Sequence, residues 1–236
     1  MQLYFIRHGQ SENNALWMST SSHKWRNEDP GLTEVGRRQA ECLAQFLNQP
    51  ASASSDFQNV AGFGITHLYS SLMVRAVTTG TIIAQALNLP LAAWKDIHEW
   101  GGIYLRDEQT DEPIGLPGRN RAYFEQHFPD LVLPDSLRDD GWWSRPFEEP
   151  ELRFPRAKRV LHDLLERHGH TDDRVALVSH GGFFSYLLAA ILDMPGREGY
   201  RFGMSNTGIS RIDFHDEAIW LNYLNRVDFL PKELIT

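Results

Sequence analysis

Two short apolar runs, each followed at once by a polar residue, a histidine and a glycine, place the strongest constraint on how this chain can fold. Residues 3–6 lead into Arg7-His8-Gly9, and residues 175–178 lead into Ser179-His180-Gly181. Unbroken apolar runs of this length are typical of strands that are buried on both faces of a parallel sheet. Residues 65–69 form a third candidate strand. These runs favour a sheet with both faces covered.

Helical periodicity follows the candidate strands. Thr33 is a suitable N-cap for a helix ending near Leu47, and Ser71 for a helix ending near Leu87. Further helices are expected over residues 155–167 and 183–192, and residues 208–214 and 218–224 are typical of a β-hairpin. Strands that alternate with helices predict an α/β fold with helices on both faces of the sheet.

Two segments interrupt this alternation. Residues 49–64 are rich in Ala, Ser and Asn, and we expect them to form a surface loop. Residues 100–150 contain many Gly, Pro and Trp residues with little periodicity, and we interpret them as an insertion packed over one edge of the sheet. A length of 236 residues suits one large domain over residues 1–236, with the insertion as a cap over the site.

The charge balance limits the partners. The 23 Lys and Arg residues against 31 Asp and Glu residues give a formal net charge of −8, and the chain has no basic block. Such a chain is a poor candidate for general binding to nucleic acid or to an anionic membrane. The single Cys42 and the lack of a signal-peptide pattern predict a cytoplasmic protein. Residues 175–192 are mostly apolar but are interrupted by Ser, His and Gly, so no membrane span is expected. The sequence carries no signal for an oligomeric state.

The two histidines are candidates for chemistry because ligands of open α/β sheets bind beyond the carboxyl ends of the strands. His8 and His180 both follow a predicted strand, and a neighbouring glycine such as Gly181 lets a ligand approach the backbone closely. Arg75 falls in the first turn of a predicted helix, where the free amides favour an anion. Together with Arg7, these side chains would form a compact phosphate pocket in an acidic protein.

Other patterns argue against a metal or a cofactor. His162, His168 and His170 lack metal-ligand spacing with a carboxylate, and no second histidine follows His98-Glu99 four positions on. The sequence contains neither a Walker loop nor the glycine pattern of dinucleotide-binding folds. We therefore expect no metal and no cofactor.

Four ordered sequence blocks resemble the histidine phosphatase superfamily, which includes the cofactor-dependent phosphoglycerate mutases. The first combines Arg7-His8-Gly9, Asn14 and residues 31–36, and the others span residues 70–79, 178–182 and 206–210. A single Arg-His-Gly triplet is a weak signal, whereas four blocks in order are specific. The resemblance implies a three-layer α/β/α sandwich with a mostly parallel sheet, and phosphoryl transfer through a phosphohistidine.

The resemblance also implies roles for individual residues. His8 would be the nucleophile, and Arg7, Arg75 and His180 would hold the phosphoryl oxygens, with further contacts from Asn14 and Gly181. The family also uses a carboxylic acid that protonates the leaving oxygen and then activates water. Glu99 is the candidate for this acid and Asp96 is the alternative. The residues after Glu99 differ from the basic-aromatic-glycine run of the mutases, which favours a phosphatase.

The insertion is expected to set substrate choice. Arg119 and Arg121 form its tight basic cluster and could reach a second anionic group, although a solvated loop is the alternative. Trp142 and Trp143, with Arg145, could instead line a pocket for an apolar or ring-bearing substrate, although such pairs more often anchor packing.

Three functions remain open from the sequence. The first is a phosphomonoester hydrolase that acts on a small phosphorylated metabolite through a phosphohistidine. The second is a cofactor-dependent phosphoglycerate mutase. The third is a catalytically inactive binding protein on a phosphatase fold, although the retained His8, Arg7, Arg75 and His180 argue against it.

Overall fold

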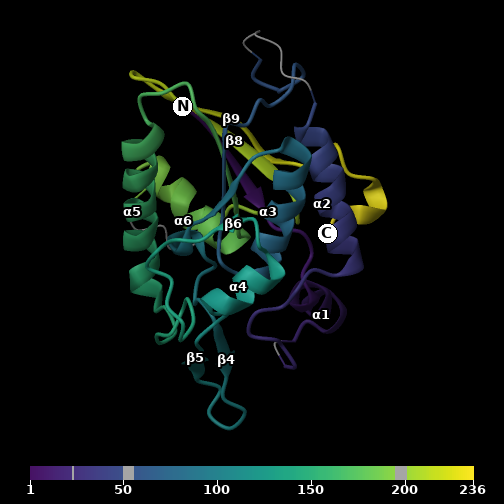
Figure 1. Ribbon diagram of the computed structural model, residues 1–236, viewed down its shortest axis with the longest axis vertical. Helices are drawn as coiled ribbons and strands as arrows, with labels where there is room; N and C mark the ends of the chain where they lie inside the picture. The colour runs from purple at the N-terminus through teal and green to yellow at the C-terminus, as the bar shows by residue number, and fades with distance from the viewer. Residues whose placement is uncertain (23, 50–55, 195–200) are drawn as a thin grey trace.

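A sheet of seven strands in the order β6-β3-β2-β7-β1-β8-β9 runs through the middle of the computed structural model, which describes residues 1–22, 24–49, 56–194 and 201–236 (Figure 1). The strands are β1 (Gln2–Arg7), β2 (His67–Ser70), β3 (Leu91–Ala93), β6 (Leu131–Val132), β7 (Arg174–Ser179), β8 (Ile209–Phe214) and β9 (Ile219–Arg226). The neighbours from β6 to β1 pair in parallel, and β8 pairs antiparallel with both β1 and β9. The prediction of a mostly parallel sheet is therefore confirmed.

Alternate side chains of the central strands enter two separate cores. In β1, Leu3 and Phe5 pack on one face, while Tyr4 and Ile6 pack on the other. Helices α5 (Pro150–His168) and α6 (Gly181–Ile191) cover the first face, and α2 (Glu34–Leu47) and α3 (Val74–Leu87) cover the second (Figure 1). Because both faces are buried, β1 and β7 are apolar throughout residues 3–6 and 175–178, which explains the unbroken runs in the sequence. The structure is a three-layer α/β/α sandwich, as expected.

The helix boundaries follow the local capping chemistry. Thr33 caps α2 by accepting a hydrogen bond from the Gly36 amide, as predicted. The helix after β2 begins only at Val74, because the Ser71 hydroxyl accepts from the Met73 amide rather than capping the helix. Helix α5 begins at Pro150, five residues before the predicted start, since proline is well suited to the first turn of a helix.

A further helix, α1 (Glu12–Thr20), follows directly after the first histidine block. Ser11 and Asn14 form a capping box at its start, with Asn14 accepting from the Ser11 amide. The apolar pattern of this segment is weak and no side chain of α1 is buried, so periodicity did not predict the helix.

The two irregular segments contribute to the core. Residues 50–55 of the predicted loop 49–64 lie outside the described residues. Residue 49 and residues 56–64 contain no helix or strand, but Phe63 is buried in the core. Residues 100–150 contain the hairpin β4 (Tyr104–Arg106) and β5 (Pro113–Gly115), helix α4 (Arg121–His127) and strand β6. Strand β6 pairs with β3 at the edge of the main sheet, and the β4–β5 hairpin projects from one end of the molecule (Figure 1).

The carboxyl end of the chain forms the expected β-hairpin from β8 and β9. Two short 3₁₀ helices complete the fold, η1 (Lys95–Ile97) and η2 (Lys232–Leu234). The apolar stretch 175–192 divides into strand β7 and helix α6, and within the described ranges no helix has the length and apolar character needed to cross a bilayer.

Candidate active site

The carboxyl ends of β1, β2 and β7 meet at one edge of the sheet beside a polar pocket, whose wall includes Arg7 and His8 but not the fully buried Ser71 and His180. Arg7 is the last residue of β1 and His8 follows it; Ser71 follows β2, and His180 follows β7. The cavity has a volume of about 270 Å³. Its walls are formed by Arg7, His8, Ser11, Asn13, Asn14, Trp17, Ser22, Arg26, Glu28, Arg75, Glu99, Trp100, Gly102 and Tyr104. This is where an open α/β sheet is expected to bind a ligand.

His8 is buried, and hydrogen bonds at both ring nitrogens hold its side chain in one orientation. Its Nδ1 lies 2.6 Å from the Gly9 carbonyl oxygen, an acceptor only, so Nδ1 carries the proton. Its Nε2 is then unprotonated and accepts from the Arg75 Nε at 3.1 Å. Burial, together with the charges of Arg75 and Arg7, holds the pKa of His8 well below its usual range. The imidazole is therefore neutral near pH 7, with Nε2 as a potential nucleophile.

His180 lies directly beside His8, with the ring centroids 5.0 Å apart. Its Nε2 is 2.9 Å from the Ser71 hydroxyl, while its Nδ1 is buried and has no partner among the described residues. Burial, followed by the charge of Arg75, also lowers the pKa of His180 well below its usual range. A neutral His180 can accept from Ser71 and donate its Nδ1 proton to a ligand oxygen, which would satisfy this buried nitrogen.

Two arginines supply positive charge at the pocket. Arg7 donates a hydrogen bond to the Met204 carbonyl oxygen, which holds its side chain across the end of the sheet. Arg75, the second residue of α3, lies 3.9 Å from the carboxylate of Asp29. Asp29 also accepts from the Val74 amide at the start of α3 at 3.0 Å. A buried carboxylate, rather than a ligand, therefore uses this first-turn amide.

Glu99, and not Asp96, lines the pocket. The Glu99 carboxylate accepts from the Trp100 amide at 2.9 Å and from the Gly182 amide at 3.1 Å. A Cβ atom on Gly182 would lie 2.3 Å from the Glu99 Oε1, so this approach requires glycine. Asp96 belongs to η1, and its carbonyl oxygen accepts from Arg156.

Asn14 and Gly181 also lie at the predicted site. Asn14 lines the pocket, and its Oδ1 accepts from the Ser11 hydroxyl and from Asn206 Nδ2, which also donates to the His8 carbonyl. A Cβ atom on Gly181 would lie 3.4 Å from the Arg7 side chain, so Gly181 borders that guanidinium stem. The four sequence blocks thus converge through these contacts.

The specificity residues expected in the insertion do not line the pocket. The Arg119 guanidinium lies over the Tyr123 ring at 4.8 Å, and Arg121 donates to the Pro134 carbonyl at 2.8 Å.

The tryptophan pair also lies in the core rather than along the pocket. Trp142 and Trp143 are buried, and the Trp143 ring packs against His98 with a centroid distance of 4.7 Å. Arg145 lies over the Trp143 ring at 3.9 Å. The pair therefore anchors packing, the alternative left open by the sequence.

Other residues form the part of the pocket wall that was expected from the arginines and tryptophans of the insertion. Trp17, Arg26 and Glu28 come from α1 and the loop after it, and Trp100 and Tyr104 come from the start of the 100–150 segment. Sequence reasoning missed them because irregular loops show no periodicity. The tryptophans and charged residues that follow the first histidine block, such as Trp17, Arg26 and Glu28, were the sequence signal that could have predicted this wall.

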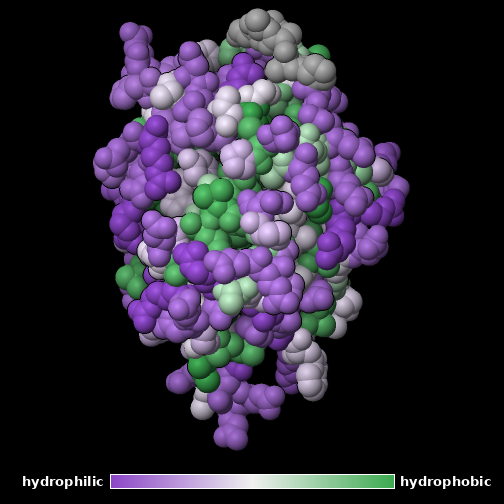
Figure 2. Space-filling model, viewed as in Figure 1, coloured by the Kyte–Doolittle hydropathy of each residue, from purple (hydrophilic) through white to green (hydrophobic). Residues whose placement is uncertain are grey.

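A second, larger hollow of about 480 Å³ lies between α3 and the segment that follows α4. Its lining is mostly apolar, with His127 and Asp130 as its titratable side chains and no arginine or lysine. Figure 2 shows an apolar patch near the middle of a mostly hydrophilic face. This hollow lacks the cations that a phosphoryl group requires, so the smaller polar pocket is the candidate active site.

Comparison with known proteins agrees with the fold and the sequence blocks. The sequence pattern of the histidine phosphatase superfamily (branch 1) matches residues 3–227, and the chain belongs to this superfamily. A probable phosphoglycerate mutase, GpmB, from Yersinia pestis (strain Pestoides F) is 26% identical over 223 residues, which cover 94% of this chain and 88% of that protein.

Solved structures show the same fold. A phosphoserine phosphatase from Entamoeba histolytica superposes with a TM-score of 0.60 at 22% identity, covering 98% of this chain and 99% of that one. A mycobacterial glucosyl-3-phosphoglycerate phosphatase gives a TM-score of 0.61 at 20% identity, covering 96% and 99%. A putative alpha-ribazole-5'-P phosphatase from Escherichia coli gives 0.62 at 20%, covering 96% of each chain.

Proposed function

We propose that this chain is a phosphomonoester hydrolase that acts on a small phosphorylated metabolite through a phosphohistidine at His8. One observation carries the proposal: a neutral His8, with its Nδ1 proton held by the Gly9 carbonyl and its Nε2 unprotonated, faces two arginines and a carboxylate in one pocket. This is the arrangement that an in-line transfer to nitrogen requires.

The first step forms a bond between His8 Nε2 and phosphorus and breaks the bond from phosphorus to the alcohol oxygen. A protonated Glu99 gives its proton to that oxygen, so the alcohol leaves neutral. In the second step, the Glu99 carboxylate takes a proton from water, the water oxygen attacks phosphorus, and the phosphorus–nitrogen bond breaks. Inorganic phosphate leaves, and both His8 and Glu99 return to their starting states.

Cationic and neutral donors of the protein would stabilise the negative charge that develops on the phosphoryl oxygens. Arg7 and Arg75 supply two guanidinium groups, and the Nδ1 of His180, which has no partner among the described residues, is available as a neutral donor. The Arg75 Nε donates to the His8 Nε2 and must release this nitrogen as it attacks phosphorus, after which the guanidinium is free to donate to a phosphoryl oxygen. Charged donors that already lie beside the reacting atoms stabilise the transition state. The proposed mechanism therefore uses no metal ion and no cofactor.

The relative named as a probable phosphoglycerate mutase makes a mutase the second candidate. We favour the hydrolase because the segment after Glu99 continues as Trp100-Gly101-Gly102 and lacks the basic residue of the mutase pattern. A mutase would retain its phosphohistidine in water and would need a bisphosphate to prime it. Turnover of an aryl phosphate without primer distinguishes the two.

The pocket and the single cysteine also bear on the substrate and on the location of the protein. The pocket volume of about 270 Å³ suits a small phosphorylated molecule. We also propose a cytoplasmic location, which the single free Cys42 supports. Fractionation of the source cells would test this location.

The central test is to trap the intermediate. Rapid acid-free quenching with a labelled substrate, in the presence of a chelator, should yield a phosphoramidate that is stable in alkali and lost in acid. His8→Ala should abolish the label, while His162→Ala, which alters an exposed histidine on α5, should retain it. Label on a serine or an aspartate, or label that requires a divalent ion, would contradict the mechanism.

A further inference from the structure

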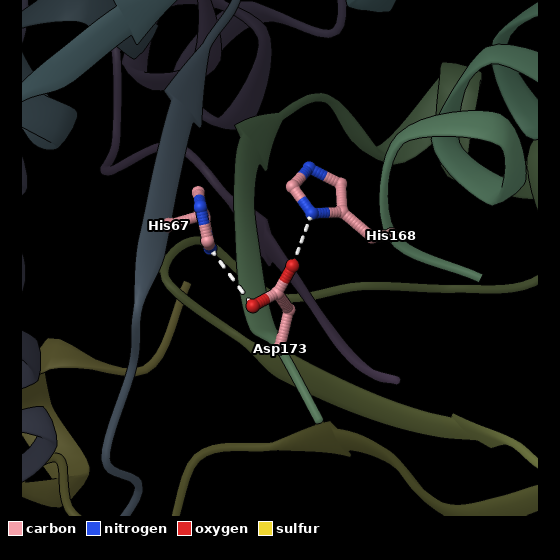
Figure 3. A group of neighbouring side chains, drawn as sticks. All are labelled: His67, His168 and Asp173. Atoms are coloured by element: carbon pink, nitrogen blue, oxygen red, sulfur yellow. Dashed lines mark hydrogen bonds and ion pairs between the residues drawn. The ribbon is translucent and has the colours of Figure 1, made fainter. Parts of the chain in front are cut away.

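Two histidines and an aspartate converge at the opposite end of the sheet from the pocket. His67 is the first residue of β2, His168 is the last residue of α5, and Asp173 directly precedes β7. Figure 3 shows both imidazole rings directed at the Asp173 carboxylate, each toward a different oxygen. The His168 Nδ1 lies 2.7 Å from Oδ2, and the His67 Nδ1 lies 3.7 Å from Oδ1.

These three side chains have the chemistry of a transition-metal site. One ligand atom from each lies within 4.8 Å of the others, and this is the one such group of three among the described residues. Imidazole nitrogen with a single carboxylate suits zinc and its neighbours, whereas magnesium and calcium prefer oxygen ligands alone. Three protein ligands leave one tetrahedral position for water.

The surroundings hold His168 in place and leave His67 accessible. The His168 side chain is only 5% exposed, and its Nε2 lies 3.1 Å from the Tyr69 hydroxyl. The His67 side chain is 41% exposed, so solvent reaches the side of the cluster that a metal would enter. A hydrogen bond at the far nitrogen of a ligating histidine is the usual support of such a site.

We propose that His67, His168 and Asp173 bind a divalent transition-metal ion of the zinc class, at a site separate from the phosphoryl pocket. Ligands of a tetrahedral zinc ion lie roughly 3.3 Å apart, given bonds of about 2.0–2.1 Å. The His168 and His67 nitrogens lie 2.7 and 3.7 Å from different oxygens of Asp173, and the three ligand atoms lie within 4.8 Å of one another. Shifts on the order of 1–2 Å, within the range of side-chain motion, would complete the site.

The proton balance is accommodated by Tyr69. Without a metal, the His168 Nδ1 donates its proton to Asp173, and its Nε2 accepts from the Tyr69 hydroxyl. With a metal on Nδ1, the remaining proton of the neutral ring moves to Nε2 and is donated to the Tyr69 oxygen. A hydroxyl can serve in both roles, so the His168 Nε2 keeps its partner. The His67 Nδ1 lies 2.9 Å from the Thr66 hydroxyl and would exchange this contact for the metal, which leaves that exposed hydroxyl to water. The ion joins α5, β2 and β7, and is expected to stabilise the fold without entering the reaction.

Isothermal titration of the whole protein with zinc chloride tests the site. Wild type should bind one saturable equivalent, with a rise in melting temperature. His67→Ala should weaken binding by more than tenfold, and Tyr69→Phe by about ten- to a hundredfold because the supporting hydrogen bond is lost. His162→Ala is the matched control and should bind as wild type does. Magnesium should give no comparable binding.

Several results would overturn the proposal. A wild type that takes up no zinc, or a His67→Ala variant with unchanged affinity, would leave the cluster as a hydrogen-bonded network only. Loss of zinc binding in His8→Ala, with retention in His67→Ala, would move the metal to the phosphoryl pocket. Phosphatase activity should be the same in His67→Ala and wild type, so this test is separate from that of the proposed function.

Discussion

At the scale of single residues, the pocket depends on burial as much as on residue type. His8 and His180 are almost completely buried, and this burial lowers the pKa of each ring well below its usual range. A solvent-exposed histidine would be partly protonated near pH 6.5 and would lose its nucleophilic lone pair. The charges of Arg75 and Arg7 oppose protonation of His8, and in the proposed mechanism the same arginines would attract the phosphoryl group.

The acid role proposed for Glu99 predicts a dependence on the leaving group. Glu99→Gln keeps an acceptor for the Gly182 amide but cannot give a proton to the alcohol oxygen. General acid catalysis contributes about 10²- to 10⁴-fold, so alkyl phosphates should lose far more rate than activated aryl phosphates. Steady-state kinetics on a series of esters measures this. Asp96→Asn is the matched control, since Asp96 is not in the pocket wall, and a larger loss in that variant would transfer the role.

Asp29 predicts a pH effect on stability. Burial, against the opposing charge of Arg75, raises the pKa of this carboxyl to about 6 from an ordinary value of 3.8. The folded state therefore keeps a proton that the unfolded state has lost, and stability falls as pH rises through this window. Asp29→Asn removes this effect. The stability of the variant relative to wild type should rise by on the order of 3 kcal/mol from pH 4 to pH 7.

Urea unfolding of the two proteins at several pH values checks the prediction for Asp29. The amide side chain introduced by Asp29→Asn would retain an oxygen for the Val74 amide, so the helix start should survive the substitution. A difference in stability that stays constant across the pH range would show that Asp29 ionises normally.

At the scale of elements, two loops rather than one set the walls of the pocket. The 100–150 segment contributes Trp100, Gly102 and Tyr104 from its beginning, while its later part packs into the core or forms the sheet edge through β6. The loop after α1 supplies Arg26, whose guanidinium lies 5.9 Å from the centre of the Tyr104 ring. We therefore expect substrate selection to depend on the facing surfaces of these two elements.

Arg26 predicts a preference for a substrate with a second negative charge. Arg26→Ala should lower kcat/KM for such a substrate about ten- to a hundredfold, because a hydrogen bond to a charged group contributes about 1.5–3 kcal/mol. Hydrolysis of a small aryl phosphate should be nearly unchanged. The double variant Arg119→Ala/Arg121→Ala is the control and should leave both substrates unaffected, since neither side chain lines the pocket.

Parallel kinetics on the two substrates decide this case. An equal fall on both substrates in Arg26→Ala would mean that this arginine supports the phosphoryl site itself. A selective fall in the Arg119→Ala/Arg121→Ala variant would return specificity to the basic cluster of the insertion.

At the scale of the whole molecule, the sheet order brings distant segments into one site. Strands β1 and β7 are neighbours although 172 positions separate His8 from His180. Parallel pairing puts the carboxyl ends of β1, β2 and β7 at the same edge, and each strand there continues into a site residue. The amino ends meet at the other edge, where His67, His168 and Asp173 converge.

Buried neutral histidines predict a loss of stability in acid. The pKa values of His8, His98 and His180 are all held well below 6.5, with burial as the largest cause. Below pH 6.5 the unfolded chain takes up protons that the folded protein excludes, so stability falls as pH falls. Each histidine contributes up to about 1.4 kcal/mol per pH unit. Asp29 acts in the opposite direction below about pH 6, so the Asp29→Asn variant is the cleaner background.

Denaturant unfolding between pH 7.5 and 5 measures this dependence. The expected result is a free energy of unfolding that falls steadily below pH 6.5 in the Asp29→Asn background. A flat profile would mean that the three rings are protonated in the folded state.

Much of this protein was predictable from local sequence. The unbroken apolar runs before His8 and His180 predicted strands covered on both faces, because this signal lies within a few neighbouring residues. The order of the four sequence blocks predicted the fold of the family. Helix α1 and the later start of the helix after Ser71 were not predictable from the sequence. Their capping side chains hydrogen-bond to groups that become neighbours only in the folded chain, such as His180 beside Ser71. For the same reason the sequence named Glu99 and Asp96 together, and the tertiary structure placed one of them against Gly182 in the pocket.

The sequence by itself predicted the residues proposed for phosphoryl transfer, whereas the tertiary structure decided what surrounds them. Arg7, His8, Arg75 and His180 follow from their positions after predicted strands or within a predicted first turn. Contacts between segments far apart in the chain carry no periodic signal. The loop wall with Arg26 and the cluster of His67, His168 and Asp173 are of this kind, because each joins elements that become neighbours only when the sheet has assembled.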